Sequence, residues 1–124
     1  MTKRILLIDD IRSDCDINGL DIPRFIDGPE PIESVLIART YTLGVDALRL
    51  MGPWDILYLD HDLAAPGLTQ PEKTGYDIIL WLEEQLHNKN YHLIPGEMIC
   101  VSANPPGRDR INQGWSAIQS KRKL

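Results

Sequence analysis

The sequence predicts an α/β fold with an open, doubly wound parallel sheet. Two apolar runs, Ile5–Ile8 and Ile56–Leu59, each lead directly into acidic residues. Continuous apolar runs of this kind are typical of parallel strands that are covered on both faces. Segments with helical spacing alternate with the strand-like runs, which favours right-handed crossovers within one sheet. We therefore expect four parallel strands in the order 2-1-3-4.

The first half of the chain predicts a strand, a long loop, a second strand and a helix. The strand over Ile5–Ile8 precedes Ile11–Ser34, whose glycines and prolines predict an ordered loop with a short helical piece around Arg12–Asn18. The apolar run Val35–Arg39 predicts the second strand. Thr40–Met51 predicts a helix, because its apolar residues recur at helical spacing before a Gly-Pro pair ends it. These apolar residues are Leu43, Ala47, Leu48 and Met51.

The second half predicts two further pairs of a strand and a helix. Trp54–Asp60 predicts the third strand, and Thr74–Gln85 predicts an amphipathic helix. Glu97–Ser102 predicts the fourth strand. The run Asn104–Pro105–Pro106–Gly107 predicts a tight turn, after which Arg108–Ser120 predicts the closing helix.

Length, charge and cysteine content limit the kind of protein. At 124 residues the chain fits one domain over residues 1–124. Its net charge of -5 argues against a protein that coats duplex DNA, but it does not exclude a small nucleotide ligand. Cys15 and Cys100 are expected to be free thiols in a reducing compartment. Because no leader and no membrane-spanning apolar run is found, we expect a cytoplasmic protein without membrane contact.

Acidic residues follow the first and third predicted strands. They are Asp9, Asp10, Asp60 and Asp62. Because parallel strands present their carboxyl ends at one edge of the sheet, these carboxylates are expected to converge there. Converging carboxylates repel one another unless they are protonated or bridged by a cation, and hard oxygen ligands suit Mg²⁺ or Mn²⁺. The alternative is that some of these aspartates cap helix N-termini.

His61 lies between two of these aspartates in the sequence. Neighbouring carboxylates stabilise a protonated imidazole, so His61 is a candidate for donating a proton to a leaving sugar oxygen. Strand alternation, however, turns His61 away from Asp60 and Asp62 unless the chain bends there.

The residues after the fourth strand are candidates for phosphate contacts. Ser102 and Asn104 supply a hydroxyl and an amide, and Gly107 allows a close approach of the backbone. Arg108 and Arg12 are candidates for a guanidinium contact with phosphate. The alternatives are that the segment from Asn104 to Gly107 is only a stiff turn and that both arginines are solvated.

With these motifs the chain resembles the receiver domains of response regulators, which share the flavodoxin-like strand order. Receivers carry paired acids after strand one, an acid after strand three and a small hydroxyl residue after strand four. They also carry a lysine after a fifth strand, and here that strand and its lysine are expected to be missing.

A closer resemblance, over nearly the whole chain, is to the receiver-like family of cyclic-phosphate-processing receiver domains. This family is encountered in bacterial and phage genomes and is linked to RNA repair. The motifs that carry the resemblance are Leu7–Ile8–Asp9–Asp10–Ile11–Arg12, Leu59–Asp60–His61–Asp62–Leu63, Thr74–Gly75–Tyr76–Asp77 and Ser102–Ala103–Asn104–Pro105–Pro106–Gly107–Arg108.

The resemblance implies a metal-dependent phosphoesterase that acts on nucleotides or RNA ends with cyclic phosphates. In this hypothesis Asp60 and His61 are the catalytic residues, and a divalent cation is the cofactor. A second hypothesis is a phosphoacceptor receiver in which Asp60 takes a phosphoryl group. A third is a binding module without turnover, which holds a nucleotide or contacts a partner protein through Ile11–Ser34.

Overall fold

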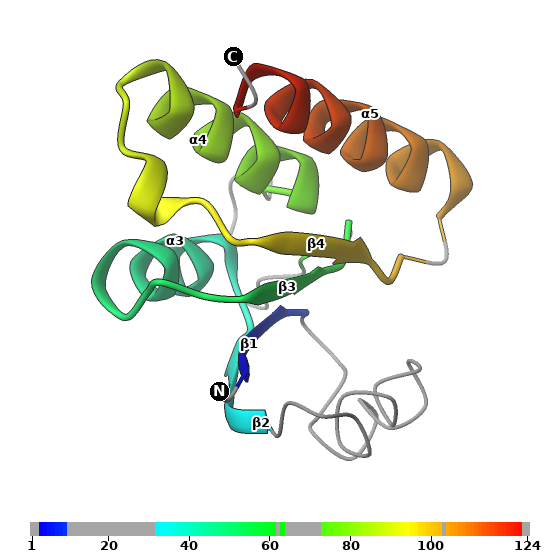
Figure 1. Cartoon of the computed structure of the whole chain (residues 1–124). Coiled ribbons are helices and arrows are strands. Elements are labelled where there is room, and N and C mark those ends of the chain that lie inside the picture. Colours follow the sequence, from blue (N-terminus) through cyan, green and yellow to red (C-terminus); the bar gives the residue numbers. More distant parts are fainter. Residues whose placement is uncertain (1–2, 10–31, 62, 64–72, 103, 123–124) are drawn as a thin grey trace.

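The computed structural model of the chain describes residues 3–9, 32–61, 63, 73–102 and 104–122 (Figure 1). Within them, four parallel strands form one sheet in the order β2-β1-β3-β4. The strands are β1 (Lys3–Ile8), β2 (Ile32–Ala38), β3 (Ile56–Leu59) and β4 (Glu97–Cys100). The strand order and the parallel pairing confirm the predicted fold class.

The register of the strands aligns their carboxyl ends. Ile8 of β1 pairs with Ala38 of β2 on one side and with Leu59 of β3 on the other. Leu59 in turn pairs with Cys100, the last residue of β4. The residues that follow these four positions therefore start from one edge of the sheet.

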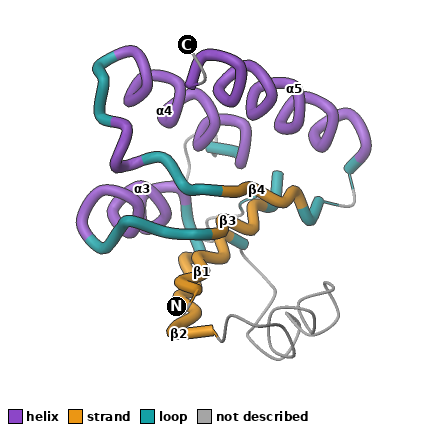
Figure 2. The backbone as a smooth tube through the Cα atoms, in the orientation of Figure 1, coloured by secondary structure: helices purple, strands orange, loops and turns teal. Residues whose placement is uncertain are grey.

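Three α-helices and one short 3-10 helix complete the described structure. They are α3 (Tyr41–Leu50), α4 (Gly75–His87), η2 (Tyr91–Leu93) and α5 (Pro105–Arg122). Buried residues of all three α-helices pack in one cluster with Leu6, Ile8, Leu57 and Leu59 of the sheet. Figures 1 and 2 show α4 and α5 next to each other above β3 and β4, with α3 on the same side.

The strand residues that alternate with Leu6, Ile8, Leu57 and Leu59 form the second face of the sheet. Ile5, Leu7, Ile56 and Tyr58 are fully buried there and pack together with Val101. The helical piece predicted around Arg12–Asn18 lies outside the described residues. Burial of both faces is what the continuous apolar runs predicted.

Most element boundaries differ from the prediction by one or two residues, and the starts of β2 and α5 differ by three. β2 begins at Ile32, so the predicted loop Ile11–Ser34 ends three residues too late in the sequence. The predicted turn from Asn104 to Gly107 is wrong, because α5 already begins at Pro105. Prolines are tolerated in the first helical turn, where their missing N–H groups would have no partner within the helix.

The amino end of the sheet is held by Arg4. Its guanidinium donates hydrogen bonds to the carbonyl oxygens of Pro53 (2.9 Å) and Met51 (2.8 Å) and lies over the ring of Trp54. These contacts attach the end of α3 and the entry to β3 to the first strand. Among the described helices, none is long and apolar enough to cross a membrane.

Candidate functional site

Two aspartates lie next to each other at the carboxyl edge of the sheet. Asp9 follows β1 and donates its backbone N–H to the Ala38 carbonyl oxygen (3.0 Å). Asp60 follows β3 and donates its backbone N–H to the Ile8 carbonyl oxygen (3.0 Å). Both hydrogen bonds extend the ladder of the sheet by one residue, so the two backbones are fixed relative to each other. Asp9 is 0% exposed and Asp60 is 8% exposed.

These two residues form the described part of the predicted metal site. Two buried carboxylates on neighbouring strands are a donor pair that fits a hard cation such as Mg²⁺ or Mn²⁺. Asp10 and Asp62, which were predicted to belong to the same site, lie outside the described residues. Among the residues that are described, no group of three or more metal-binding side chains is assembled.

His61 lies on the helix side of the sheet. Its carbonyl oxygen accepts a hydrogen bond from the backbone N–H of Gly75 (2.7 Å) in the first turn of α4. Its imidazole lies against Gly107 in the first turn of α5, where an added Cβ would be 2.8 Å from Nδ1. The strand alternation that was expected to turn His61 away from Asp60 is consistent with this contact.

Gly75 is required by the close approach of α4 to the end of β3. A Cβ at this position would overlap the Asp60 carbonyl oxygen and lie 2.9 Å from its carbonyl carbon. Both of these are backbone atoms, which have little freedom to move. Thr74 caps α4 just before this contact, because its hydroxyl accepts the N–H of Tyr76 and its own N–H donates to Asp77 (2.7 Å). These contacts give Gly75 and Asp77 structural roles at the start of α4.

The predicted phosphate-binding residues after β4 form one local structure at the start of α5. Ser102 is fully buried, and its Oγ accepts a hydrogen bond from the backbone N–H of Asn104 (3.0 Å). The Asn104 side-chain oxygen accepts from the backbone N–H of Gly107 (3.3 Å), which makes Asn104 the N-cap of α5. The two side chains therefore have structural roles that the sequence did not reveal.

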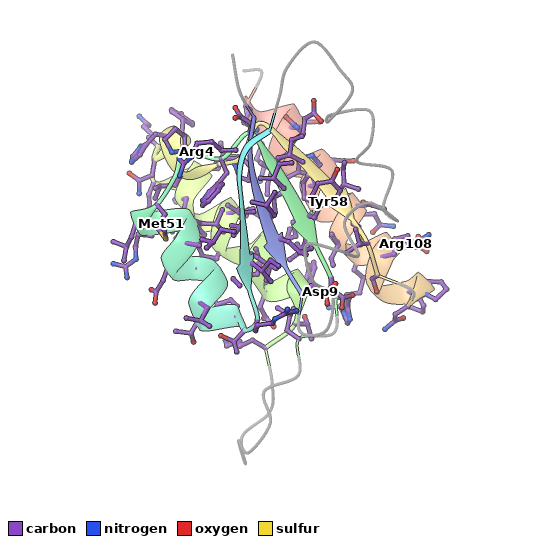
Figure 3. The ribbon with its side chains drawn as sticks, turned by 90° about the horizontal axis from the view of Figure 1, so that it is seen from below. Arg4, Asp9, Met51, Tyr58 and Arg108 are labelled. Atoms are coloured by element: carbon purple, nitrogen blue, oxygen red, sulfur yellow. The ribbon has the colours of Figure 1, made fainter. Side chains whose placement is uncertain are left out.

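Arg108 is attached to the same structure. Its Nε and Nη2 atoms both donate to the Ser102 carbonyl oxygen, at 3.1 and 2.6 Å. Figure 3 shows Arg108 on α5 and Asp9 at the carboxyl end of β1. The side chain of Arg108 is exposed, so its guanidinium is held at this edge and still reaches solvent. Arg12, the other predicted arginine, lies outside the described residues.

Arg39 is a residue at this edge that the sequence interpretation did not consider. It follows β2 directly, and its Nη1 lies 3.4 Å from the carbonyl oxygen of Asp9. The rule that selected the aspartates also applies to Arg39, because it is the first charged residue after a parallel strand. Arg39 adds, with Arg108, a positive charge to an edge that carries two buried carboxylates.

Cys100, the last residue of β4, reports on the electrostatics of this edge. Burial raises the pKa of its thiol, and the charge of Asp60 adds to this rise. A hydrogen bond from the Ser102 backbone and the charge of Arg108 act in the opposite direction. The net direction is upward, so the thiol is protonated at neutral pH.

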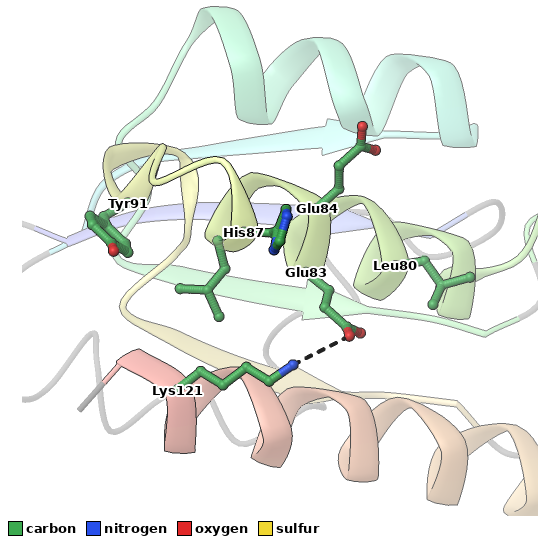
Figure 4. A pocket seen from close by; sticks show the side chains of 7 residues that line it. Leu80, Glu83, Glu84, His87, Tyr91 and Lys121 are labelled. Carbon is green, nitrogen blue, oxygen red and sulfur yellow. Dashed lines mark ion pairs between the residues drawn. The ribbon is translucent and has the colours of Figure 1, made fainter. Parts of the chain in front are cut away.

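One pocket of the described structure lies elsewhere. It is a groove of about 600 Å³ between the C-terminal halves of α4 and α5. Figure 4 shows that Leu80, His87 and Tyr91 line it, and that Glu83 and Lys121 form an ion pair (3.6 Å) across it. None of the predicted site residues is among its lining residues.

Comparison with known proteins places the chain in a family. A family model for the cyclic-phosphate processing receiver domain matches residues 4–117. No curated protein matches the chain. The solved structure of the bacteriophytochrome response regulator AtBRR is similar over 94% of each chain, with 17% sequence identity and a TM-score of 0.45, a likeness too small to bear on the site. Because the family model extends from β1 into α5, the chain belongs to the family of cyclic-phosphate processing receiver domains.

Proposed function

We propose that this chain is a metal-dependent phosphoesterase that hydrolyses cyclic phosphates on nucleotides or RNA ends. The observation that carries the proposal is the arrangement at the carboxyl edge of the sheet. Two buried carboxylates, an imidazole fixed by backbone contacts and a buried hydroxyl follow three adjacent strands. In a family named for cyclic-phosphate processing, these groups supply the donors that phosphoester hydrolysis requires.

Asp9 and Asp60 would hold the divalent cation, with Asp10 and Asp62 as the further predicted carboxylate ligands. When bound there, Mg²⁺ or Mn²⁺ would polarise a phosphoryl oxygen and acidify a water molecule. The backbones of Asp9 and Asp60 are held by hydrogen bonds of the sheet, so these two ligands start from fixed positions. Preorganisation of this kind is what an electrostatic site requires.

His61 moves the proton in this mechanism. Water loses one proton to solvent as its oxygen forms a bond to phosphorus, the bond from phosphorus to one ribose oxygen breaks, and that oxygen takes a proton from the imidazolium of His61, which regains a proton from solvent. The ring meets Gly107 with its Cγ, Cδ2 and Nδ1 atoms, so Nε2 is the nitrogen farther from the helix. We therefore assign proton transfer to Nε2.

Ser102 and two arginines bind the phosphate oxygens. The Ser102 Oγ accepts a hydrogen bond from Asn104, which leaves its hydroxyl hydrogen to be donated. Arg108 uses two of its five N–H groups on the Ser102 carbonyl oxygen, and the remaining ones can face an anion. Arg39 contributes positive charge from the end of β2.

The direct test is turnover of 2′,3′-cyclic mononucleotides by the purified protein, with Mg²⁺, with Mn²⁺ and with EDTA. We expect a metal-dependent monophosphate product from the parent and none from the Asp60→Asn variant. Absence of product with both metals and all four nucleotides would overturn the proposal.

A second experiment separates this proposal from phosphoryl transfer to Asp60, whose position after the third strand is the one expected of a phosphoacceptor. The protein is incubated with acetyl phosphate and Mg²⁺, and its intact mass is measured. We expect an unchanged mass, because β4 is followed in the described residues by α5 alone and no fifth strand supplies a lysine. A gain of one phosphoryl group that is lost in Asp60→Asn would favour the receiver alternative.

A further inference from the structure

Arg110 on α5 is held by an aromatic ring and not by protein oxygens. Its guanidinium carbon lies over the Tyr76 ring of α4, 4.4 Å from the ring centroid. Within the residues that the structure describes, Arg110 has no hydrogen bond or ion pair. Every other described arginine donates a hydrogen bond to a protein oxygen; these are Arg4, Arg39, Arg49, Arg108 and Arg122. The N–H donors of Arg110 are therefore open to a ligand.

The Tyr76 ring is a firm support for this guanidinium. Tyr76 lies in the first turn of α4, is partly buried and packs against the core. A Cβ added at Gly114 of α5 would lie 3.8 Å from its Cε1 atom, so the ring is in the space between the two helices. Attraction between the cation and the face of the ring then holds the Arg110 guanidinium above it.

The pair borders the contacts that position the proposed catalytic groups. Tyr76 directly follows Gly75, the residue that meets the backbone at the end of β3. Arg110 comes three residues after Gly107, which packs on the His61 ring. Residues three apart are neighbours on one side of a helix, and helical side chains lean toward the helix N-terminus. Arg110 therefore reaches back toward the carboxyl edge of the sheet.

We propose that the guanidinium of Arg110, stacked on Tyr76, is the platform for the nucleobase of the substrate. This inference rests on the phosphoesterase function proposed above and specifies its substrate class. One face of the guanidinium lies on the ring, and Arg110 is exposed, so the opposite face can accept a ligand. Bases stack on guanidinium planes, and every base has a face that can do so. The platform therefore favours nucleotides over other cyclic phosphate esters without selecting one base.

The other described pairs of a cation and an aromatic ring do not offer such a platform. Lys73 lies over the Tyr41 ring between the starts of α3 and α4, but its ammonium is a compact charge without a flat face. Arg4 and Arg122 also lie over rings, but both donate to carbonyl oxygens at the opposite edge of the sheet. Among the described pairs, Arg110 and Tyr76 alone combine a planar cation, open donors and a place near the carboxyl edge.

The experiment compares two ligands that the proposed reaction does not consume. Adenosine 3′-monophosphate carries a base and a phosphate, and ribose 3-phosphate lacks the base. Isothermal titration calorimetry of the full chain with Mg²⁺ measures both dissociation constants. We expect the nucleotide to bind the parent at least about fivefold more tightly, since a stacked base contributes at least this factor.

Arg110→Lys keeps the positive charge and removes the planar face. The variant should bind the nucleotide less than about twofold more tightly than ribose 3-phosphate, because the stacking contribution is lost. Its affinity for ribose 3-phosphate should equal that of the parent. Arg122→Lys is the matched control, because it makes the same change in the pair at the other end of α5, and it should keep the parent's preference for the nucleotide.

The platform would be overturned by a parent that binds neither ligand or both equally, or by an Arg110→Lys variant that keeps the parent's preference. Turnover of cyclic nucleotides by the same protein would in that case leave the phosphoesterase proposal standing. Conversely, a preference for the nucleotide that is lost only in Arg110→Lys, in a protein without turnover, would support the platform and overturn the catalytic proposal.

Discussion

His61 is held by backbone atoms of α4 and α5. Its carbonyl oxygen accepts a hydrogen bond from Gly75, and its ring packs on Gly107. Such contacts restrict where the imidazole can lie, as a group that transfers a proton to a defined atom requires.

We predict that His61→Gln lowers the hydrolysis rate of a cyclic nucleotide about 10²–10⁴-fold, because glutamine cannot transfer a proton. Mn²⁺ binding should persist, because the ring lies on the helix side of the sheet. His87→Gln, an exposed change on α4, is the control and should retain the parent rate. Steady-state kinetics and a thermal melt of each variant provide the measurements. Parent-like turnover by a folded His61→Gln variant would assign proton transfer to another group.

Cys100 provides a test of the site geometry that is independent of any enzymatic activity. Burial and the Asp60 charge raise the pKa of its thiol above the ordinary value of 9.0, whereas the Arg108 charge opposes the rise. We predict that alkylation by iodoacetamide, measured against pH in a Cys15→Ser background with EDTA, has its midpoint above that value. Asp60→Asn should lower the midpoint, and Arg108→Met should raise it.

The direction of this shift also affects stability at alkaline pH. A thiol with a raised pKa in the folded state binds its proton more tightly there than in the unfolded chain. Its contribution to the free energy of unfolding is present below the ordinary pKa and is lost as the pH rises through the folded-state value. A Cys100 midpoint below 9.0 would contradict the burial and the charge arrangement described for this edge.

The first turns of α4 and α5 approach the end of β3 through glycines, but they meet different kinds of atoms. Gly75 faces the backbone of Asp60, and Gly107 faces the side chain of His61. We predict that Gly75→Ala lowers the free energy of unfolding by about 3 kcal/mol, because backbone atoms cannot move aside. Gly107→Ala should lower it by less, by about 1 kcal/mol, because the His61 side chain must change its χ1 angle to clear the new Cβ, and the higher helix propensity of alanine offsets part of that cost.

Urea denaturation of both variants measures these differences. The NMR signals of the His61 ring provide the second readout, and they should shift in Gly107→Ala while the fold persists. Equal stability losses in the two variants would contradict the distinction between a backbone and a side-chain neighbour.

The order and type of the strands and α-helices could be predicted from apolar periodicity alone, whereas two boundaries could not. The prolines at positions 105 and 106 predicted a turn, and the structure uses them in the first turn of α5, capped by Asn104. β2 begins immediately after Pro31, where pairing with β1 outweighs the local turn signals. Both errors arise because tertiary contacts override local preference at the ends of elements.

Part of the candidate site was predictable for a simple reason. Asp9, Asp60 and Ser102 follow parallel strands, so the register alone brings them to one edge. The same rule would have included Arg39. The contact between His61 and Gly107 could not be foreseen, because it depends on how α5 packs on the sheet.

The two ends of the sheet differ in the charged side chains that they hold. Arg4 at the amino end binds carbonyl oxygens and covers a tryptophan ring, which stabilises the fold without a ligand. The carboxyl end holds Asp9 and Asp60, two carboxylates with almost no exposed surface. Arg39 and Arg108 supply positive charge near this edge, and a bound divalent cation would add to it.

We therefore predict that millimolar Mg²⁺ or Mn²⁺ raises the thermal midpoint of the parent protein. A ligand that binds only the folded state stabilises it by about 2.7 kcal/mol at a hundredfold excess over its dissociation constant. For a domain of this size, each kcal/mol corresponds to roughly 4 °C. The thermal midpoint of Asp60→Asn should rise less or not at all on addition of metal, because this variant lacks one carboxylate ligand and half of the buried charge.

Calorimetric scans with and without metal measure this rise, and Glu84→Gln is the control because it neutralises an exposed carboxylate on α4. Glu84→Gln should keep the full rise, which separates a specific site from general screening of a chain with net charge -5. In the absence of metal, Asp60→Asn should melt above the parent, since the repulsion at the edge is relieved. A parent midpoint that is unchanged by metal, together with a destabilised Asp60→Asn variant, would assign the aspartates a structural role at the edge of the sheet.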